Sequence, residues 1–126
     1  MTNDRRTLVF LTRPDGAALR MAGSCALAAA AMGDRVDVFL MGESVRAVVE
    51  AAGERAGVGE RDGEQDAAAA ALFQARSAGT CRIFACSQGV VESGLDPAAA
   101  QAVVDAVVGW PTILEWTRGV ADRFFF

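Results

Sequence analysis

The residues best suited to chemistry lie in the stretch 82–89, where an apolar run leads directly into Cys86 and then into polar, glycine-containing sequence. The backbone N–H groups of Ser87, Gln88 and Gly89, in a turn or at the start of a following helix, are able to point at the sulfur and favour its thiolate. The thiolate is the nucleophilic form of cysteine. Two interpretations follow: a thiol presented for chemistry, or a small core residue that ends a strand.

The other two cysteines fit the core. Cys25 lies in an alanine-rich helical stretch and Cys81 opens the strand that Cys86 ends, and unpaired cysteine is commonly buried. At ~3.3 Å per residue, Cys81 is roughly 15 Å from Cys86, too far for a disulfide. Three cysteines in no metal-ligand spacing favour a reducing cytoplasm and predict no metal site.

Composition removes several classes of function. The chain has no histidine, which excludes Ser-His and Cys-His catalytic pairs within it. All 12 basic residues are arginines, yet the net charge is −4, and no basic stripe with interleaved aromatic residues is present. We therefore expect no binding to nucleic acid or to anionic membranes.

No targeting or membrane segment is evident. Residues 1–6 are polar, the apolar run 8–11 is too short for a signal core, and Arg20 and Ser24 interrupt the apolar stretch 17–32. We expect a soluble, cytoplasmic protein. With 126 residues it suits one domain, and its 52% hydrophobic content predicts that some apolar surface packs against another subunit.

Apolar periodicity and turn residues predict alternating strands and helices. The predicted strands are 7–11, 36–41, 80–85 and 122–126, and the predicted helices are 17–32, 44–53, 67–78, 97–104 and 110–117. Asp96 is the expected N-cap of its helix, with Pro97 at the first helical position. Glycines among charged residues predict a solvated loop over 54–66. This order predicts a three-layer α/β domain with a mainly parallel sheet of about 4–5 strands and helices on both faces.

The helix at 17–32 is apolar nearly all round, since only Arg20 and Ser24 are polar in it. Such a helix is covered on more than one side. We expect the sheet on one flank and a neighbouring subunit on the other.

Sites in an open parallel sheet form beyond the carboxyl ends of its strands. Cys86 is the only cysteine expected there, and is the candidate catalytic residue. The candidate substrate-binding residues at the same edge are Arg13, Asp15, Glu43, Ser87 and Gln88. Three of them have a simpler interpretation: Asp15 as a helix N-cap, Arg13 as a surface arginine, and Glu43 as a solvated carboxylate.

A phosphate-binding loop would fall at residues 12–16 in this fold. That stretch has neither Gly-x-Gly-x-x-Gly spacing nor a Walker lysine. We predict no cofactor, although the position alone leaves a flavin site open.

The order of these parts resembles the DsrE/DsrF-like family of small α/β subunits in sulfur metabolism and tRNA thiolation. The resemblance covers nearly the whole chain, and it implies that residues 1–126 form one domain related to Rossmann and flavodoxin folds. It rests on the apolar first strand, Ala-Met-Gly-Asp before the second strand, the strand leading to Cys86 and Ser87, the step Gly94-Leu95-Asp96, and Ala121-Asp122 before the last strand.

The resemblance implies a function and partners. In that family the cysteine after the third strand, where present, accepts sulfur as a persulfide and passes it to a small sulfur-carrier protein, and here that position is Cys86. Thiol–persulfide exchange needs neither histidine nor metal. The family also implies a homo-oligomer, trimer or hexamer. The alternatives are a non-catalytic assembly or small-ligand-binding subunit, and a thiol redox sensor that lacks a second cysteine nearby.

Overall fold

The computed structural model describes residues 5–55, 63–119 and 122–126. Within them the chain forms β1 (Arg6–Leu11), α1 (Gly16–Ala31), β2 (Arg35–Leu40), α2 (Ser44–Arg55), α3 (Gly63–Ser77), β3 (Cys81–Cys86), α4 (Ser87–Glu92), α5 (Pro97–Gln101), β4 (Ala106–Val108), α6 (Trp110–Trp116) and β5 (Asp122–Phe125). The predicted α/β fold is confirmed, with a five-stranded sheet and all described pairings parallel.

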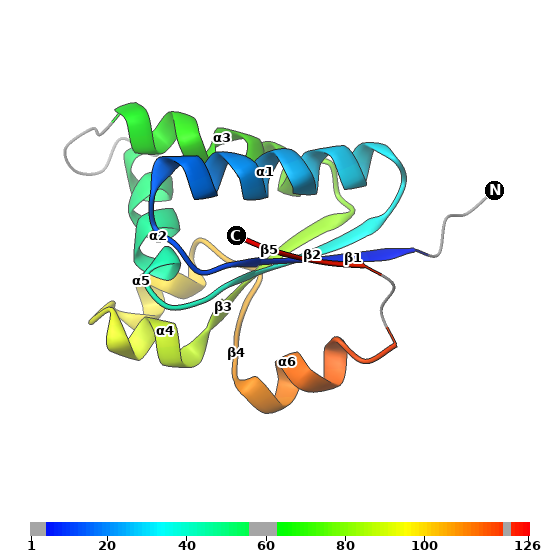
Figure 1. Cartoon of the computed structure of the whole chain (residues 1–126). Helices are drawn as coiled ribbons and strands as arrows, with labels where there is room; N and C mark the ends of the chain where they lie inside the picture. Colours follow the sequence, from blue (N-terminus) through cyan, green and yellow to red (C-terminus); the bar gives the residue numbers. More distant parts are fainter. Residues whose placement is uncertain (1–4, 56–62, 120–121) are drawn as a thin grey trace.

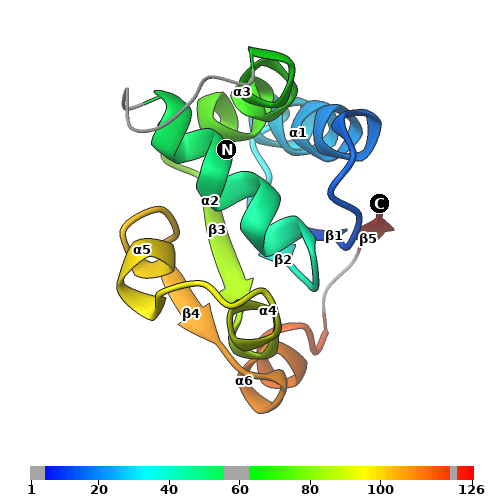
Figure 2. The same ribbon diagram turned by 90° about the vertical axis from the view of Figure 1, so that its left-hand side faces the viewer.

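The sheet has the strand order β4-β3-β2-β1-β5 (Figure 1). The first four strands are added in one direction, and the chain then returns through α6 to place β5 beside β1. Since all strands are parallel, their carboxyl ends meet at one edge, where α2 and α4 begin (Figures 1 and 2). Any site at that edge therefore collects residues from the loops after β1, β2 and β3.

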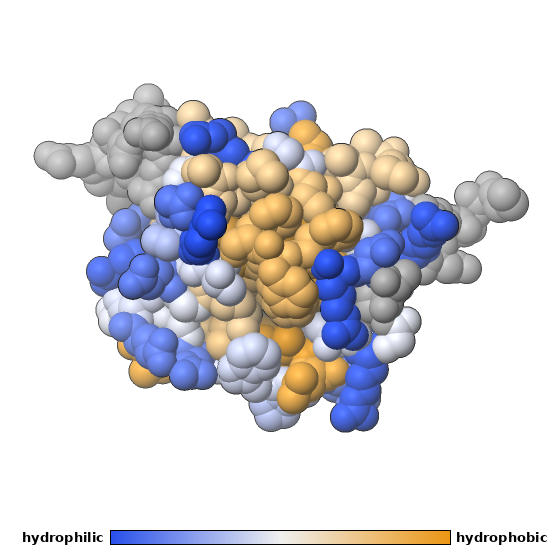
Figure 3. Space-filling model, in the orientation of Figure 1, coloured by the Kyte–Doolittle hydropathy of each residue, from blue (hydrophilic) through white to orange (hydrophobic). Residues whose placement is uncertain are grey.

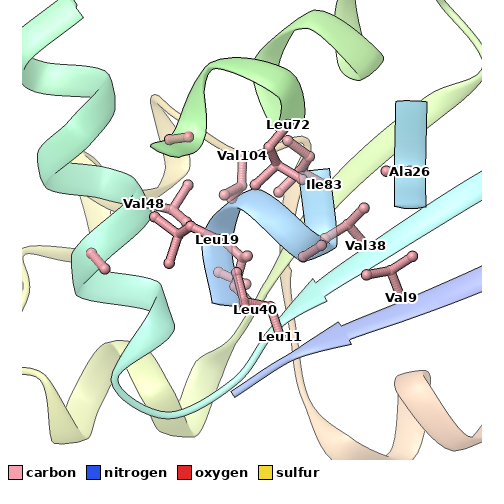
Figure 4. Close-up of a cluster of buried hydrophobic side chains, with 14 of the residues drawn as sticks. Val9, Leu11, Leu19, Ala26, Val38, Leu40, Val48, Leu72, Ile83 and Val104 are labelled. Atoms are coloured by element: carbon pink, nitrogen blue, oxygen red, sulfur yellow. The ribbon is translucent and has the colours of Figure 1, made fainter. Parts of the chain in front are cut away.

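One face of the sheet, here called the helical face, is covered by α1, α2 and α3. Its core is mainly aliphatic, as the labelled side chains of Figure 4 show, with Leu19, Leu72 and Ile83 fully buried. The helices approach closely, because a Cβ added at Gly23 of α1 would lie 2.8 Å from the Leu72 backbone nitrogen of α3. This contact explains the second apolar flank of α1: α3 of the same chain covers much of it. Met21 and Met32 of α1 remain exposed.

The opposite face, here called the aromatic face, is covered by α6. Its buried cluster consists of Leu8, Phe10, Phe39, Met41, Phe84, Cys86, Val108 and Ile113. Neighbouring strands place Phe125, Phe10, Phe39 and Phe84 in register. Their rings stack in a row with centroids 4.9, 5.2 and 5.5 Å apart, and Trp116 of α6 lies 5.0 Å from the last ring.

Asp37 lies on the aromatic face, two residues before Phe39 in β2, and so on the amino-terminal side of the row of rings. It is 4% exposed and pairs with Arg6 (2.9 Å) and Arg82 (3.1 Å). The Arg82 guanidinium also lies 5.0 Å from the centroid of the Phe84 ring, a cation–π contact. A charged pair of this kind closes the amino end of the aromatic face without leaving the buried carboxylate unpaired.

Three predicted boundaries were wrong. Residues 54–55 belong to α2 and 63–66 to α3, so the predicted loop is helical at both ends, while 56–62 lie outside the described residues. The helix starting at Pro97 ends at Gln101, because the chain must straighten to form β4, a strand that was not predicted. β4 has 3 residues, too few for a periodic signal.

β5 is an edge strand with all four residues exposed. Phe124 is 44% and Phe125 69% exposed. Figure 3 shows hydrophobic surface gathered over the part of this view where β5 lies in Figure 1. Large exposed apolar areas of this kind mark interaction sites.

Candidate functional site

Cys86 is the last residue of β3 and the N-cap of α4. It pairs with Val108 of β4 at the carboxyl edge of the sheet. The chain turns into α4 directly, with Cys86 still extended at φ −69° and ψ 128°. The helix start, one of the two local structures considered for residues 87–89, is therefore the one present, and Cys86 lies at the edge expected for a site.

The side chain of Cys86, however, is buried. It is 3% exposed and belongs to the aromatic cluster beneath α6. Its sulfur receives no hydrogen bond from the first turn of α4. The amides of Ser87, Gln88 and Gly89 thus do not provide the expected contact with the thiol.

The alternation of side chains along a strand explains this environment. Cys81 and Cys86 are five positions apart, an odd spacing, so they point to opposite faces. Cys81 packs in the helical face and Cys86 in the aromatic face. The face on which each thiol lies could be predicted from the sequence. Cys86 is two positions from Phe84 and so shares its face, whereas Cys81 is three positions away and does not. The arrangement also separates the two thiols by the sheet as well as by the length of β3.

Burial acts on the other two thiols. It raises the pKa of Cys81 to about 12, with the carboxylates of Asp37 and Asp105 adding to the effect. Burial likewise raises the pKa of Cys25 in α1. Both thiols are held in the protonated, poorly nucleophilic form.

Ser87 and Gln88 are exposed residues of α4. The side-chain amide of Gln88 donates to Glu92 of the same helix at 2.9 Å. Ser87 faces the start of α6, since its Oγ lies 3.5 Å from the position of a Cβ built on Gly109. The Ser87 hydroxyl is therefore next to the start of α6, whereas Gln88 is engaged along α4.

Arg13 and Asp15 form a pair after β1. Arg13 Nε lies 3.1 Å from Asp15 Oδ1, and both side chains are largely exposed. Asp15 is the N-cap of α1 and accepts from the Ala18 backbone N–H at 3.1 Å. That hydrogen bond, with the Arg13 charge, lowers the pKa of Asp15. The capping role considered from the sequence is confirmed for Asp15.

Glu43 lines a cavity of about 470 Å³, here called the carboxyl-edge cavity. Its lining residues are Pro14, Gly42, Glu43, Arg46, Ala47, Glu50, Glu92 and Ser93. Arg46 donates to the Ser93 carbonyl at 2.6 Å and lies 3.7 Å from Glu50. The other candidate site residues do not line this cavity, namely Cys86, Ser87, Gln88, Arg13 and Asp15. The structure therefore brings Glu43 together with α2 and α4 residues rather than with the other candidates.

Sequence reasoning did not single out Arg46 and Glu50 as site residues. Their i,i+4 spacing on the helix after Glu43 could have indicated them, since it places both on one helix face.

Sequence reasoning also missed the role of Ser44. Its buried hydroxyl contacts the Leu11 carbonyl at 2.6 Å and accepts from the Met41 N–H at 3.0 Å. Ser44 thus ties the loops after β1 and β2 together beneath the cavity.

The molecule is thus a small α/β protein with a parallel sheet and one of its three thiols, Cys86, at the carboxyl edge. A family model described as the DsrE/DsrF-like family matches residues 5–125, so the chain belongs to that family. Its members are generally sulfur-relay proteins. A search among curated proteins found no match.

None of the helices in the described parts of the chain has the length and apolar character needed to cross a membrane.

Proposed function

We propose that the protein is a sulfur-relay subunit that carries sulfur as a persulfide on Cys86. The observation that carries this proposal is the position of Cys86 at the carboxyl edge of the sheet in a chain of the DsrE/DsrF-like family. The raised pKa values of Cys25 and Cys81 support the choice, because both thiols are poor nucleophiles.

The transfer consists of two exchanges. The Cys86 thiolate attacks the outer sulfur of a donor persulfide, the donor S–S bond breaks, and the donor leaves as a thiolate that takes up a proton. Cys86 then holds the sulfur as Cys86–S–SH. An acceptor thiolate attacks that outer sulfur and releases the Cys86 thiolate. One sulfur atom moves, and no external oxidant or reductant is consumed.

Access to the buried sulfur requires local opening. The cluster around Cys86 includes Val108 and Ile113, on either side of the start of α6. Gly109, the N-cap of α6, makes no side-chain capping hydrogen bond. A glycine N-cap is less stabilising than serine or aspartate by roughly a few tenths of a kcal/mol, and α6 is only 7 residues long, so its first turn is weakly held. We therefore place the opening at the first turn of α6.

The proposed partner is a small sulfur-donor or sulfur-carrier protein that docks at the carboxyl edge, where Arg13, Glu43, Ser87 and Gln88 are exposed. We also propose a cytoplasmic homo-oligomer, trimer or hexamer. The exposed Met21, Met32 and Phe124 side chains support association between subunits. Sedimentation of the purified chain tests it: a monomer at micromolar concentration contradicts the oligomer.

The direct test is the intact mass after incubation with a persulfide donor, before and after reduction. We expect a reducible gain of about 32 Da, one sulfur atom. The gain should disappear in Cys86→Ser and remain in the matched variants Cys25→Ser and Cys81→Ser. Loading that survives Cys86→Ser, or no loading under conditions that load a known carrier, would contradict the proposal.

A second candidate is a non-catalytic assembly or small-ligand-binding subunit. The 3% exposure of Cys86 favours it, because a buried thiol among aromatic side chains is ordinarily structural. In that case no cysteine gains sulfur, and Cys86→Ser changes stability alone. The mass measurement separates the two candidates.

A further inference from the structure

A second cavity lies on the aromatic face, between α6 and the carboxyl ends of β1 and β5. It has a volume of about 310 Å³ and is here called the α6 cavity. Its apolar walls are formed by Phe10, Met41, Trp110, Ile113, Leu114 and Phe125. In this sheet the junction of β1 and β5 is where strand order changes direction, the place where α/β folds bind small ligands.

Aromatic rings are already arranged at this cavity for stacking. Phe125 lies over Phe10 with centroids 4.9 Å apart and an interplanar angle of 10°. Phe125 is nevertheless 69% exposed, and Trp110 is 47% exposed. Two large rings that line one cavity and remain exposed offer apolar surface to a planar molecule.

Arg123 is the one cation among the residues described at this cavity. Its Nη2 donates to the carbonyl of Thr117, the C-cap of α6, at 2.6 Å. This bond fixes the guanidinium at the cavity, and a guanidinium has five N–H donors, so others remain available. Arg123 forms no ion pair with the carboxylates of the residues that the structure describes.

Among the described residues that line this cavity, none is acidic. The charge at the α6 cavity is therefore positive, in contrast to the carboxyl-edge cavity with Glu43, Glu50 and Glu92. A fixed guanidinium beside apolar walls is the arrangement that binds a carboxylate through charge-assisted, bidentate hydrogen bonds.

From these observations we infer that the α6 cavity binds a small planar aromatic carboxylate, with its ring against Phe125 and its carboxylate on Arg123. The volume is at the lower end of the roughly 300–1,000 Å³ of small-molecule sites. It suits one or two fused rings and is too small for a dinucleotide. The inference goes beyond sulfur transfer and does not depend on it.

The test compares 2-naphthoate with its uncharged analogue 2-naphthamide, by calorimetric titration of the full chain. We expect saturable binding with 2-naphthoate about tenfold tighter, the preference that one charge-assisted hydrogen bond provides. In Arg123→Gln the preference should disappear. It should persist in Arg118→Gln, a matched control in which an exposed arginine paired with Glu115 is changed.

A second variant keeps the test independent of folding effects. Leu114 is 56% exposed, so Leu114→Glu should fold, yet its carboxylate beside the cavity should weaken 2-naphthoate more than 2-naphthamide. The inference is wrong if neither compound saturates up to about 1 mM. It is also wrong if both bind equally, or if Leu114→Glu instead dissociates an oligomer that had covered the cavity.

Discussion

The two faces of the sheet use opposite kinds of packing. On the helical face, α1, α2 and α3 cover an aliphatic core, and Gly23 lets α1 and α3 approach to backbone contact. On the aromatic face, α6, a helix of 7 residues, covers a row of stacked rings and leaves a cavity of about 310 Å³. The same five strands support both faces.

The difference in packing suggests that the two faces have different roles, one in stability and the other in function. A core covered by three helices has little room for movement, because closely packed interiors accommodate few changes. A face covered by one helix of 7 residues opens at lower cost, because a short helix buries less apolar surface than three longer ones. Cys86 and the α6 cavity both lie on that second face. We therefore expect the helical face to determine stability and the aromatic face to determine reactivity and binding.

The largest effect is expected from Leu72→Ala on the helical face. Leu72 is fully buried between α1 and α3, and its truncation should lower the free energy of unfolding by about 3 kcal/mol. Urea denaturation measures the change. A loss below about 1 kcal/mol would mean that this face is not the main source of stability.

Ile113→Ala makes the corresponding change on the aromatic face. Ile113 is 1% exposed but borders the α6 cavity, so we expect a smaller loss, about 2 kcal/mol, at the low end for such truncations. The variant should also react faster at Cys86 with N-ethylmaleimide, measured by mass in a Cys25→Ser, Cys81→Ser background. Unchanged reactivity would show that α6 does not control access to the thiol.

The framework of both faces could be predicted from local signals. Strands β1, β2 and β3 are continuous apolar runs, and Asp15 and Asp96 were recognised as N-caps that the structure confirms. Trp110–Trp116 was correctly predicted as a helix. These features depend on a few neighbouring residues, which is why the sequence is sufficient for them.

The environment of Cys86 could not be predicted in the same way. Its burial depends on Val108 and Ile113, which the fold brings against it from β4 and α6. β4 is too short to be recognised, and the packing of α6 on the aromatic face is a tertiary contact. Position at the carboxyl edge was therefore predictable, whereas exposure of the thiol was not.

The burial of Cys81 in the helical face predicts a pH dependence of the free energy of unfolding. Its pKa is raised from 9.0 to about 12, so the unfolded chain releases this proton at a lower pH than the folded chain. The resulting stability is fully present below pH 9 and is lost as the pH rises toward 12. Between pH 8 and 10, the unfolding free energy should fall by about 1 kcal/mol more in the unchanged chain than in Cys81→Ala.

The chain is suited to this measurement because it has no lysine or tyrosine, two side chains that would otherwise titrate near that range. Cys25 is present in both proteins, and its contribution cancels in the comparison. Parallel pH profiles for the two proteins would show that Cys81 is not held protonated by the helical face.

The smallest effect is expected from Leu114→Ser, at the rim of the α6 cavity. Leu114 is 56% exposed, so its loss should change the free energy of unfolding by less than about 0.5 kcal/mol. Val91→Ser, at 78% exposure on α4, is the matched control and should be equally neutral. A loss above 1 kcal/mol for Leu114→Ser alone would place this side chain in the folding core. If both variants are neutral but Leu114→Ser weakens binding of 2-naphthoate, the apolar rim of the aromatic face contributes to binding and not to folding.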